Sequence, residues 1–177
     1  TGKGLLVFDY DQDGYLDLFI VNNSGSPSLY RNDLANGNHW LRVKLRGRYS
    51  NRDGIGAVVT IMSGDGVPVQ HREISGGSHY LTQSEKLAHF GLGASAAPVH
   101  LVKVRWPSGI EQQFSNVAVD QVLEVTEPVS PYEAWLAEHF SEVERAAGVM
   151  TALLADSDAD GLSNAVEFGS GLDPRSA

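Results

Sequence analysis

Hydrophobic and polar side chains alternate along most of the chain between residues 39 and 127. In the segment WLRVKLR, residues 40–46, leucine and valine alternate with arginine and lysine, which is the period of a half-buried strand. Turn-forming segments such as SGDG, SGGS and PSG separate this run from others like it. Roughly seven short strands at this spacing predict an antiparallel β sandwich. The further strand-like runs are residues 56–62, 67–74, 87–92, 99–106, 110–114 and 121–127.

The same alternation predicts which side chains form the core of the sandwich. Successive side chains of a strand point to opposite faces, so one face of each strand should be buried. Trp40, like Trp106, is interpreted as a core residue. The rest of the expected core consists of Leu41, Val43, Val102, Val104, Leu123 and Val125.

The two ends of the chain follow different patterns. Residues 4–8 and 16–21 predict two strands joined by a polar loop, and residues 29–33 predict a third. After Pro128 the spacing becomes helical, and residues 131–155 predict a helical stretch with Ser130 as its N-cap. A second helix should begin near Ser163 and end at Gly169 or Gly171. The apolar face of the first helical stretch is expected to contain Trp135, Leu136, Phe140 and Val143.

The distribution of charge follows the same three regions, which we take as residues 1–38, 39–127 and 128–177. The net charge is −9, and it divides into −3 for residues 1–38, +1 for 39–128 and −7 for 129–177. No basic patch is visible, so a nucleic-acid partner is not expected. No run approaches the roughly 20 apolar residues of a membrane span. Cysteine is absent, so disulfides cannot staple the fold. Thr1 opens almost directly into a strand, which predicts a processed chain or a piece of a longer one.

The excess of acids lies in two loops with the pattern DxDxDG. These loops are DYDQDG at residues 9–14 and DSDADG at residues 156–161. Like charges so close together repel, so a cation is expected among them. The side-chain oxygens at positions 1, 3 and 5 of such a loop converge on one point, and the glycine at position 6 permits the sharp turn. Oxygen-only ligands with high negative charge select calcium over zinc or copper. The sequence therefore predicts two calcium sites.

The C-terminal loop has the ligand spacing of an EF-hand. A carboxylate at position 12, where a bidentate ligand completes that loop, and helical patterns on both sides support this interpretation. The predicted ligands are the side chains of Asp156, Asp158, Asp160, Asn164 and Glu167, with Leu162 through its carbonyl.

The N-terminal loop is predicted to be the β-hairpin version of the same site. Its position 12 is Ile20, so no bidentate glutamate closes it, and strand-like sequences flank it on both sides. The last acid stands at position 9 instead. The predicted ligands are Asp9, Asp11, Asp13 and Asp17, with Tyr15 through its carbonyl.

Longer blocks of sequence resemble known families. FDYDQDGYLDLFIVN followed by LYRND resembles a calcium-binding repeat of the FG-GAP or VCBS type, the blade unit of integrin-like β-propellers. NHWLRVKLRG, SNRDGIGAVVTI, SGGSHYLTQSE, HFGLG and VRWPSGIEQQFSNVAVDQVLEVTE together resemble the ASPIC/UnbV domain, which follows such repeats in bacterial surface proteins. The C-terminal loop resembles EF-hand-like, dockerin-type or thrombospondin-type-3-like calcium motifs. The expected fold is therefore mainly β: a partial propeller blade, an antiparallel sandwich and a small helical EF-hand-like unit.

No catalytic constellation is apparent, so an enzyme is not expected. The six histidines lack metal-ligand spacing, and no nucleophile elbow accompanies the serines near His79. We expect a non-catalytic, calcium-stabilised module of a secreted or cell-surface protein, used for adhesion, matrix attachment or assembly. Millimolar calcium outside cells suits the weak affinity of extracellular calcium modules. A protein or glycan partner is expected, of unknown identity.

Two alternatives remain open at this point. A carbohydrate-binding module would use His79 and Tyr80 of the segment SGGSHYL to stack on a sugar. A subunit of an extracellular polymer would assemble through the incomplete N-terminal blade, because short strands with unpaired edges invite strand addition. The hairpin of residues 1–33 is in any case expected to pack against its own sandwich, an upstream propeller or a neighbouring subunit, because a two- or three-stranded ribbon is marginal alone.

Overall fold

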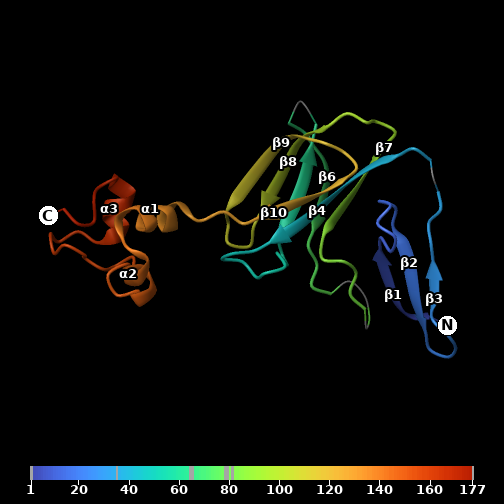
Figure 1. Ribbon diagram of the computed structural model, residues 1–177, viewed down its shortest axis with the longest axis horizontal. Helices are drawn as coiled ribbons and strands as arrows, with labels where there is room; N and C mark the ends of the chain where they lie inside the picture. Colours follow the sequence, from blue (N-terminus) through green and yellow to red (C-terminus); the bar gives the residue numbers. More distant parts are fainter. Residues whose placement is uncertain (1, 35, 64–65, 78–79, 81, 177) are drawn as a thin grey trace. The chain divides into compact units, whose positions relative to one another are not determined.

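A computed structural model describes residues 2–34, 36–63, 66–77, 80 and 82–176. The chain divides into two compact units, residues 1–127 and residues 128–177. The first unit holds three β-sheets, and the second holds short helices and a long loop (Figure 1). The predicted fold class, mainly β with a small helical unit, is confirmed.

The first sheet is the N-terminal ribbon. It has the antiparallel order β1-β2-β3, formed by β1 (Gly2–Phe8), β2 (Asp17–Asn22) and β3 (Ser28–Tyr30). The polar loop 9–16 joins β1 to β2, as predicted. The ribbon packs against the sandwich of its own chain: the Val7 N–H donates to Ser84 Oγ at 3.2 Å, and Thr82 Oγ1 donates to the Leu5 carbonyl at 2.8 Å.

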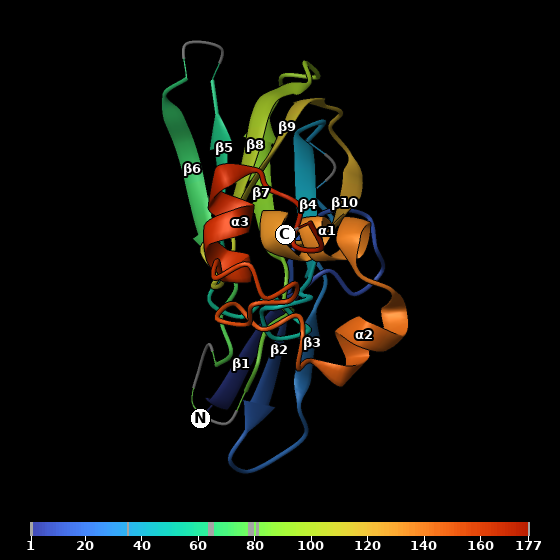
Figure 2. The ribbon, with the colours of Figure 1, turned by 90° about the vertical axis from the view of Figure 1, so that its left-hand side faces the viewer.

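The sandwich consists of a three-stranded and a four-stranded sheet. The three-stranded sheet has the order β10-β4-β7. The four-stranded sheet has the order β6-β5-β8-β9, and Figure 2 shows its strands side by side in one layer. One strand pair is not antiparallel, contrary to the expectation. β10 follows β9 of the other sheet along the chain and pairs with β4 in parallel. The strands are β4 (His39–Arg46), β5 (Val58–Met62), β6 (Pro68–Glu73), β7 (Ala88–Gly93), β8 (Val99–Arg105), β9 (Glu111–Val117) and β10 (Gln121–Thr126).

The core lies between these two sheets, where the alternating pattern places it. Leu41 and Val43 of β4 and Val102 and Val104 of β8 are fully buried. Trp106 and Val125 are buried too, and Leu123 is half-buried against the same cluster. Fully burying one such aliphatic side chain stabilises the fold by roughly 1.5–3 kcal/mol. The predicted register of these strands is therefore confirmed.

Trp40 is an exception to the predicted core. It lies on β4 between His39 and the core residue Leu41, and it is only half-buried. Because alternate side chains of a strand face opposite ways, Trp40 shares the outer face of the sheet with Arg42 rather than the inner face with Leu41. Its indole ring packs against Gly14 instead: a Cβ added to Gly14 would lie 1.8 Å from Trp40 Nε1.

A buried carboxylate fastens two loops at one end of the sandwich. Glu127 is only 1% exposed, and one of its oxygens accepts hydrogen bonds from the backbone N–H groups of Arg48, Tyr49 and Ser50 at 2.7–3.0 Å. The other oxygen accepts from the hydroxyls of Ser50 and Ser108. Burial alone would raise the pKa of Glu127, but the hydroxyl of Ser108 and the backbone donors together lower it to about 2.

The second unit contains α1 (Pro131–His139), α2 (Glu142–Ala147) and α3 (Asn164–Ser170). Ser130 caps α1, and α3 begins and ends where the sequence predicts. The single helical stretch over residues 131–155 is wrong, because Phe140 is extended and Ser141 starts α2 with a capping box to Glu144. Gly148 then ends α2 in the left-handed conformation.

The core of this unit is a small aromatic cluster. Leu136 and Phe140 are buried, and Tyr132 and Trp135 of α1 both contact Phe168 of α3 with ring centroids 5.3 and 5.7 Å apart. Val143 is 79% exposed, so its predicted place on the apolar face is wrong. It falls in α2, which turns its own side chains away from the cluster after the break at Phe140. In the described part of the chain, no helix is long and apolar enough to cross a membrane.

Candidate metal sites in two aspartate loops

The first aspartate loop, residues 9–17, and the second, residues 156–167, have the same local backbone. Positions 4 and 6 have positive φ in both: 62° at Gln12 and 91° at Gly14, and 65° at Ala159 and 94° at Gly161. The left-handed region costs a non-glycine residue roughly 1–2 kcal/mol, so the loop sequence must compensate at position 4. Local hydrogen bonds that the aspartates accept from backbone N–H groups do so.

These hydrogen bonds are also the same in the two loops. The glycine N–H at position 6 donates to the aspartate at position 1, from Gly14 to Asp9 at 2.9 Å and from Gly161 to Asp156 at 3.0 Å. The N–H at position 7 donates to the aspartate at position 5, from Tyr15 to Asp13 at 2.8 Å and from Leu162 to Asp160 at 2.7 Å. In each loop the backbone thus folds around the carboxylates of that loop and donates hydrogen bonds to them, as a cation-binding loop of this type requires.

The structure brings most of the predicted ligands together. Carboxylate oxygens of Asp9, Asp11 and Asp17 lie within 4.8 Å of one another, as do those of Asp156, Asp158 and Asp160. Asp13 is outside the first group and Glu167 outside the second. The predicted ligand sets therefore stay predictions, with a convergent carboxylate triplet in each loop.

The first loop is bound to the sandwich by a buried cation. Arg42, on the outer face of β4, donates from Nη1 to Asp9 at 2.9 Å and from Nη2 to Glu85 at 2.6 Å. The side chain of Asp9 is fully buried and that of Arg42 is 7% exposed. This ion pair is close and shielded from water, so it compensates part of the negative charge of the loop without any metal.

Three further contacts fix the first loop. Asp17 is 1% exposed, and its two oxygens accept from the N–H groups of Tyr10 and Asn32, both at 2.7 Å. His89 Nε2, on β7, lies 2.9 Å from the Gly14 carbonyl. Together with the indole of Trp40, these contacts seat the loop on the outer face of the β10-β4-β7 sheet. The sequence pattern missed this arrangement, because it assigned Trp40 to the core and gave Arg42 no role.

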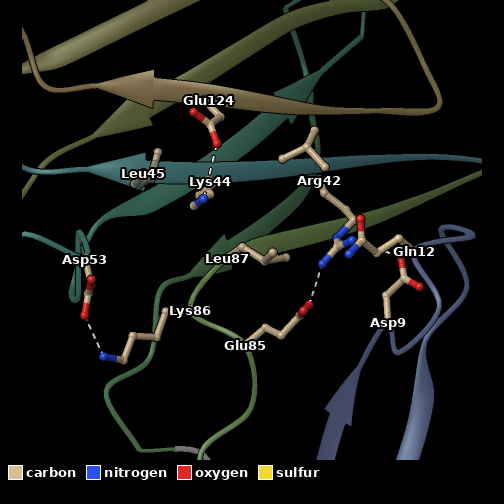
Figure 3. A pocket seen from close by; sticks show the side chains of 11 residues that line it. Asp9, Gln12, Arg42, Lys44, Leu45, Asp53, Glu85, Lys86, Leu87 and Glu124 are labelled. Carbon is tan, nitrogen blue, oxygen red and sulfur yellow. Dashed lines mark hydrogen bonds and ion pairs between the residues drawn. The ribbon is translucent and has the colours of Figure 1, made fainter.

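A cavity of about 590 Å³ lies beside the contact between the first loop and the β10-β4-β7 sheet (Figure 3). It extends along β4 from Arg42 to Lys44 and across to the segment that carries Glu85 and Lys86. Its cations are already paired, Arg42 as described, Lys44 with Glu124 at 3.2 Å and Lys86 with Asp53 at 2.6 Å. Among the described residues, the cations that line the cavity are therefore all paired, and of them only Arg42 binds a carboxylate of the first loop.

Among the described residues, no cation pairs with the acids of the second loop, and one oxygen of a buried acid there has no hydrogen-bond partner. Glu167 is 1% exposed, and its Oε2 atom has no hydrogen-bond partner; the same holds for Asp158 Oδ2. Burial raises the pKa of Glu167, and the neighbouring carboxylates of Asp158, Asp160 and Asp156 raise it further. An orphaned buried carboxylate oxygen facing three acids fits a divalent cation, because a metal is what would compensate it.

Asn164 acts as a brace within the second loop. It is fully buried, its amide nitrogen donates to the carbonyls of Met150 and Ala152 at 2.7 and 2.9 Å, and its Oδ1 accepts from Ser157 Oγ at 2.8 Å. These bonds hold residues 150–155 as turns, so no helix enters the loop and only α3 leaves it. The expected helix on the N-terminal side of the EF-hand-like loop is wrong for this reason.

The proposed sugar contact at SGGSHYL is only partly within the described residues. His79 lies outside them, and Tyr80 is 71% exposed beside β1 and β2 at a shallow pocket that includes Leu5 and Ile20. The contact therefore stays a prediction without a defined site.

Comparison with known proteins finds a family model and three relatives that match part of the chain. Residues 47–131 match the family described as ASPIC and UnbV. Cartilage acidic protein 1 of Mus musculus and that of Homo sapiens are each 35% identical over 132 residues, which cover 72% of this chain. The protein of the same name in Xenopus tropicalis is 32% identical over the same length. The chain spans about a fifth of the length of these relatives. The ASPIC/UnbV resemblance is thus supported, while the two calcium-motif resemblances stay predictions.

Proposed function

We propose that this chain is a non-catalytic calcium-binding module of an extracellular or cell-surface protein, used for adhesion, matrix attachment or assembly. The observation that carries the proposal is the shared geometry of the two aspartate loops, with the same left-handed positions and the same glycine-to-aspartate hydrogen bonds. The buried, unpaired oxygens of Glu167 and Asp158 support it for the second loop. Calcium acts here as a staple of structure.

The extracellular setting rests on the relatives. The name of cartilage acidic protein 1 refers to cartilage, a tissue that is built mainly of extracellular matrix. Extracellular modules work with calcium dissociation constants of roughly 10⁻⁴–10⁻³ M, which suits loops that bind a free ion weakly. In this view residues 1–33 form a calcium repeat of the FG-GAP or VCBS type, and the second loop is the EF-hand-like staple of the C-terminal unit.

In each site the chain itself supplies the ligands. In the first loop Asp11, Asp13 and the Tyr15 carbonyl would bind the ion together with Asp9 and Asp17. In the second, Asp156, Asp158 and Asp160 would bind it from the loop, and Glu167 would reach it from α3. Glu167 stands next to Phe168, so its ligation would tie the ion to the aromatic cluster of the unit.

Calcium titration by calorimetry tests the proposal. The intact chain should bind two calcium ions, and Glu167→Ala should remove one of them while the first loop still binds. Glu138→Ala, an exposed acid on α1 outside the loop, is the matched control and should keep both sites. For the first loop, Asp11→Ala should remove the other ion, with exposed Glu73→Ala on β6 as its control. A chain that binds no calcium would end the proposal.

Assembly is a second role, favoured by one observation. The N-terminal ribbon exposes apolar side chains on several strands: Leu18 and Val21 are each 39% exposed, Leu29 is 43% and Tyr30 58% exposed. A partner protein or a second copy would cover them. Sedimentation of the intact chain at increasing concentration should then show association that Leu29→Ser weakens. A monomer at all concentrations would exclude self-assembly through this ribbon.

A further inference from the structure

A second cavity lies beside the first aspartate loop, distinct from the cavity of Figure 3. Its volume is about 280 Å³, just below the range of roughly 300–1,000 Å³ that ligand pockets occupy. Four segments build it: residues 14–16 of the first aspartate loop, residues 32–38 of the connector to β4, the start of β4, and β7. Such a size suits a single ring rather than an extended chain.

The lining of this cavity carries no fixed charge. Among the described residues that line it, none is an aspartate, glutamate, lysine or arginine, although the chain as a whole has a net charge of −9. The cavity of Figure 3, on the same face of the same sheet, is lined by paired acids and bases instead. A charged ligand would lose its hydration here without a counter-charge, so the lining selects a neutral one.

The lining combines aromatic rings with amide and imidazole groups. Tyr15 and Trp40 supply rings, and Tyr15 is held in place because its hydroxyl donates to the Asn38 carbonyl at 3.3 Å. Asn36 accepts the Asn38 N–H through Oδ1 at 3.0 Å, which leaves its amide N–H₂ as a donor. An aromatic face beside amide groups suits a ligand with apolar C–H faces and a rim of hydroxyls.

Two histidines that line the cavity are each oriented by a contact at one ring nitrogen. His39 Nδ1 lies 2.6 Å from Asp120 Oδ2, so its other ring nitrogen remains for a ligand. His89 Nε2 lies 2.9 Å from the Gly14 carbonyl, which leaves its Nδ1. Each ring thus offers one nitrogen in a fixed direction, and fixed polar groups are what give a neutral polyhydroxylated ligand its orientation.

From these features we infer that the cavity formed by the first aspartate loop, the connector 32–38, β4 and β7 is a binding site for one neutral sugar residue. This inference goes beyond the calcium proposal and does not depend on it. Calcium at the first loop would fix the position of Tyr15, but the remaining walls come from the sandwich and the connector.

A titration of the isotope-labelled 177-residue chain by NMR tests the inference directly. The probes are the methyl glycosides of glucose, galactose, mannose and N-acetylglucosamine, with the methyl glycoside of glucuronic acid as a charged analogue. At least one neutral probe should shift the amide signals of residues 14–16, 36–40 and 89–93, and the charged analogue should not. Shifts confined to other regions, preference for the charged analogue, or no shift with any neutral probe would overturn the inference.

A variant that fills the cavity sharpens this test. Gly91 of β7 pairs with Trp40 and lines the cavity, and a Cβ added there meets no atom within 4 Å. Gly91→Val should therefore leave the melting temperature nearly unchanged, since valine favours strands, and weaken sugar binding by about tenfold or more. Lys44→Ala, in the cavity of Figure 3, should leave sugar binding unchanged. Equal binding by Gly91→Val and the unaltered chain would also overturn the inference.

The calcium proposal is judged separately in the same samples. The titrations are repeated with calcium and with a chelator, and calcium binding to Gly91→Val is measured by calorimetry. Sugar binding in both conditions would leave the calcium proposal to its own test, and calcium binding without any sugar binding would refute only this inference.

Discussion

The two aspartate loops have the same local structure and opposite tertiary settings. Each places positive φ at positions 4 and 6 and directs its glycine N–H to its first aspartate. The first loop is then covered by the sandwich, where Arg42 pairs with buried Asp9. The second loop encloses Glu167, a buried acid whose Oε2 has no partner. The same loop is therefore paired with a protein cation in one place and keeps an uncompensated buried acid in the other.

This difference predicts which loop depends more on calcium. In the first, Arg42 supplies a permanent positive charge, so the loop should keep its shape without metal. In the second loop, the acids repel one another, and the small aromatic core of the unit stabilises the fold too little to offset that repulsion. Calcium would be an addition to the first loop and a condition of folding for the second.

Replacement of Arg42 should have the largest effect. Arg42→Met keeps much of the side-chain volume but leaves Asp9 buried without its cation, and breaking a buried pair in this way costs about 3–5 kcal/mol. Calcium should restore part of that loss, because the ion can compensate Asp9 from the other side. Urea unfolding with calcium and with a chelator measures both terms. Lys44→Met, the next outward-facing position on β4, should change stability by under about 1 kcal/mol. Equal effects of the two variants would show that Arg42 does not hold the first loop.

Acid should destabilise the first unit through a carboxylate that belongs to neither aspartate loop. The folded pKa of Glu127, about 2, lies below its ordinary value of 4.5, so its stabilisation is complete above pH 4.5. It is lost as the pH falls towards 2, by up to about 3 kcal/mol. Thermal unfolding in chelator, followed between pH 7 and pH 2, should show this loss in the unaltered chain. Glu127→Gln should be less stable at pH 7 and should have a flatter profile. A parallel pair of profiles would contradict this role for Glu127.

Removal of calcium should destabilise the second unit and leave the sandwich of the first unit folded. At a free calcium concentration about 100 times the dissociation constant, binding stabilises a site by roughly 2.7 kcal/mol. On chelation, residues 131–176 should lose protection from hydrogen exchange, while residues 39–127 keep theirs, because the sandwich has its own core. Hydrogen exchange followed by mass spectrometry resolves the two regions. Loss of protection in the sandwich first would reverse the proposed difference between the loops.

Alanine at the two loop glycines gives the smallest and most closely matched effects. Gly161→Ala should cost roughly 1–2 kcal/mol, the cost of the left-handed conformation, since a Cβ there meets no atom within 4 Å. Gly14→Ala carries the same backbone cost and in addition forces the Trp40 ring to move. Melting temperatures of the two variants, each with calcium, measure the difference. If Gly14→Ala is no more destabilising than Gly161→Ala, then the indole of Trp40 does not hold the first loop in place.

The sequence by itself determined the local structure of this protein. Alternation in β4 and β8 placed Leu41, Val43, Val102 and Val104 in the core, because a strand side chain can face only one of two ways. The spacing of aspartates and glycines likewise determined both loops, since the hydrogen bonds that the two loops share join residues at most five positions apart. The break after α1 also had a local signal, the capping box at Ser141 and Glu144, which the continuous helical composition around it obscured.

Only the tertiary structure decided what surrounds these local elements. Arg42 and Asp9 are 33 residues apart, and the backbone N–H groups that donate to Glu127 lie 77–79 residues from it. The parallel pairing of β10 with β4 and the packing of Trp40 on Gly14 also join distant positions. Periodicity reports which face of an element is apolar but not which element will cover it. That choice depends on how the strands are ordered in space, so it decided which aspartate loop receives a protein cation and which keeps a buried carboxylate oxygen without a partner.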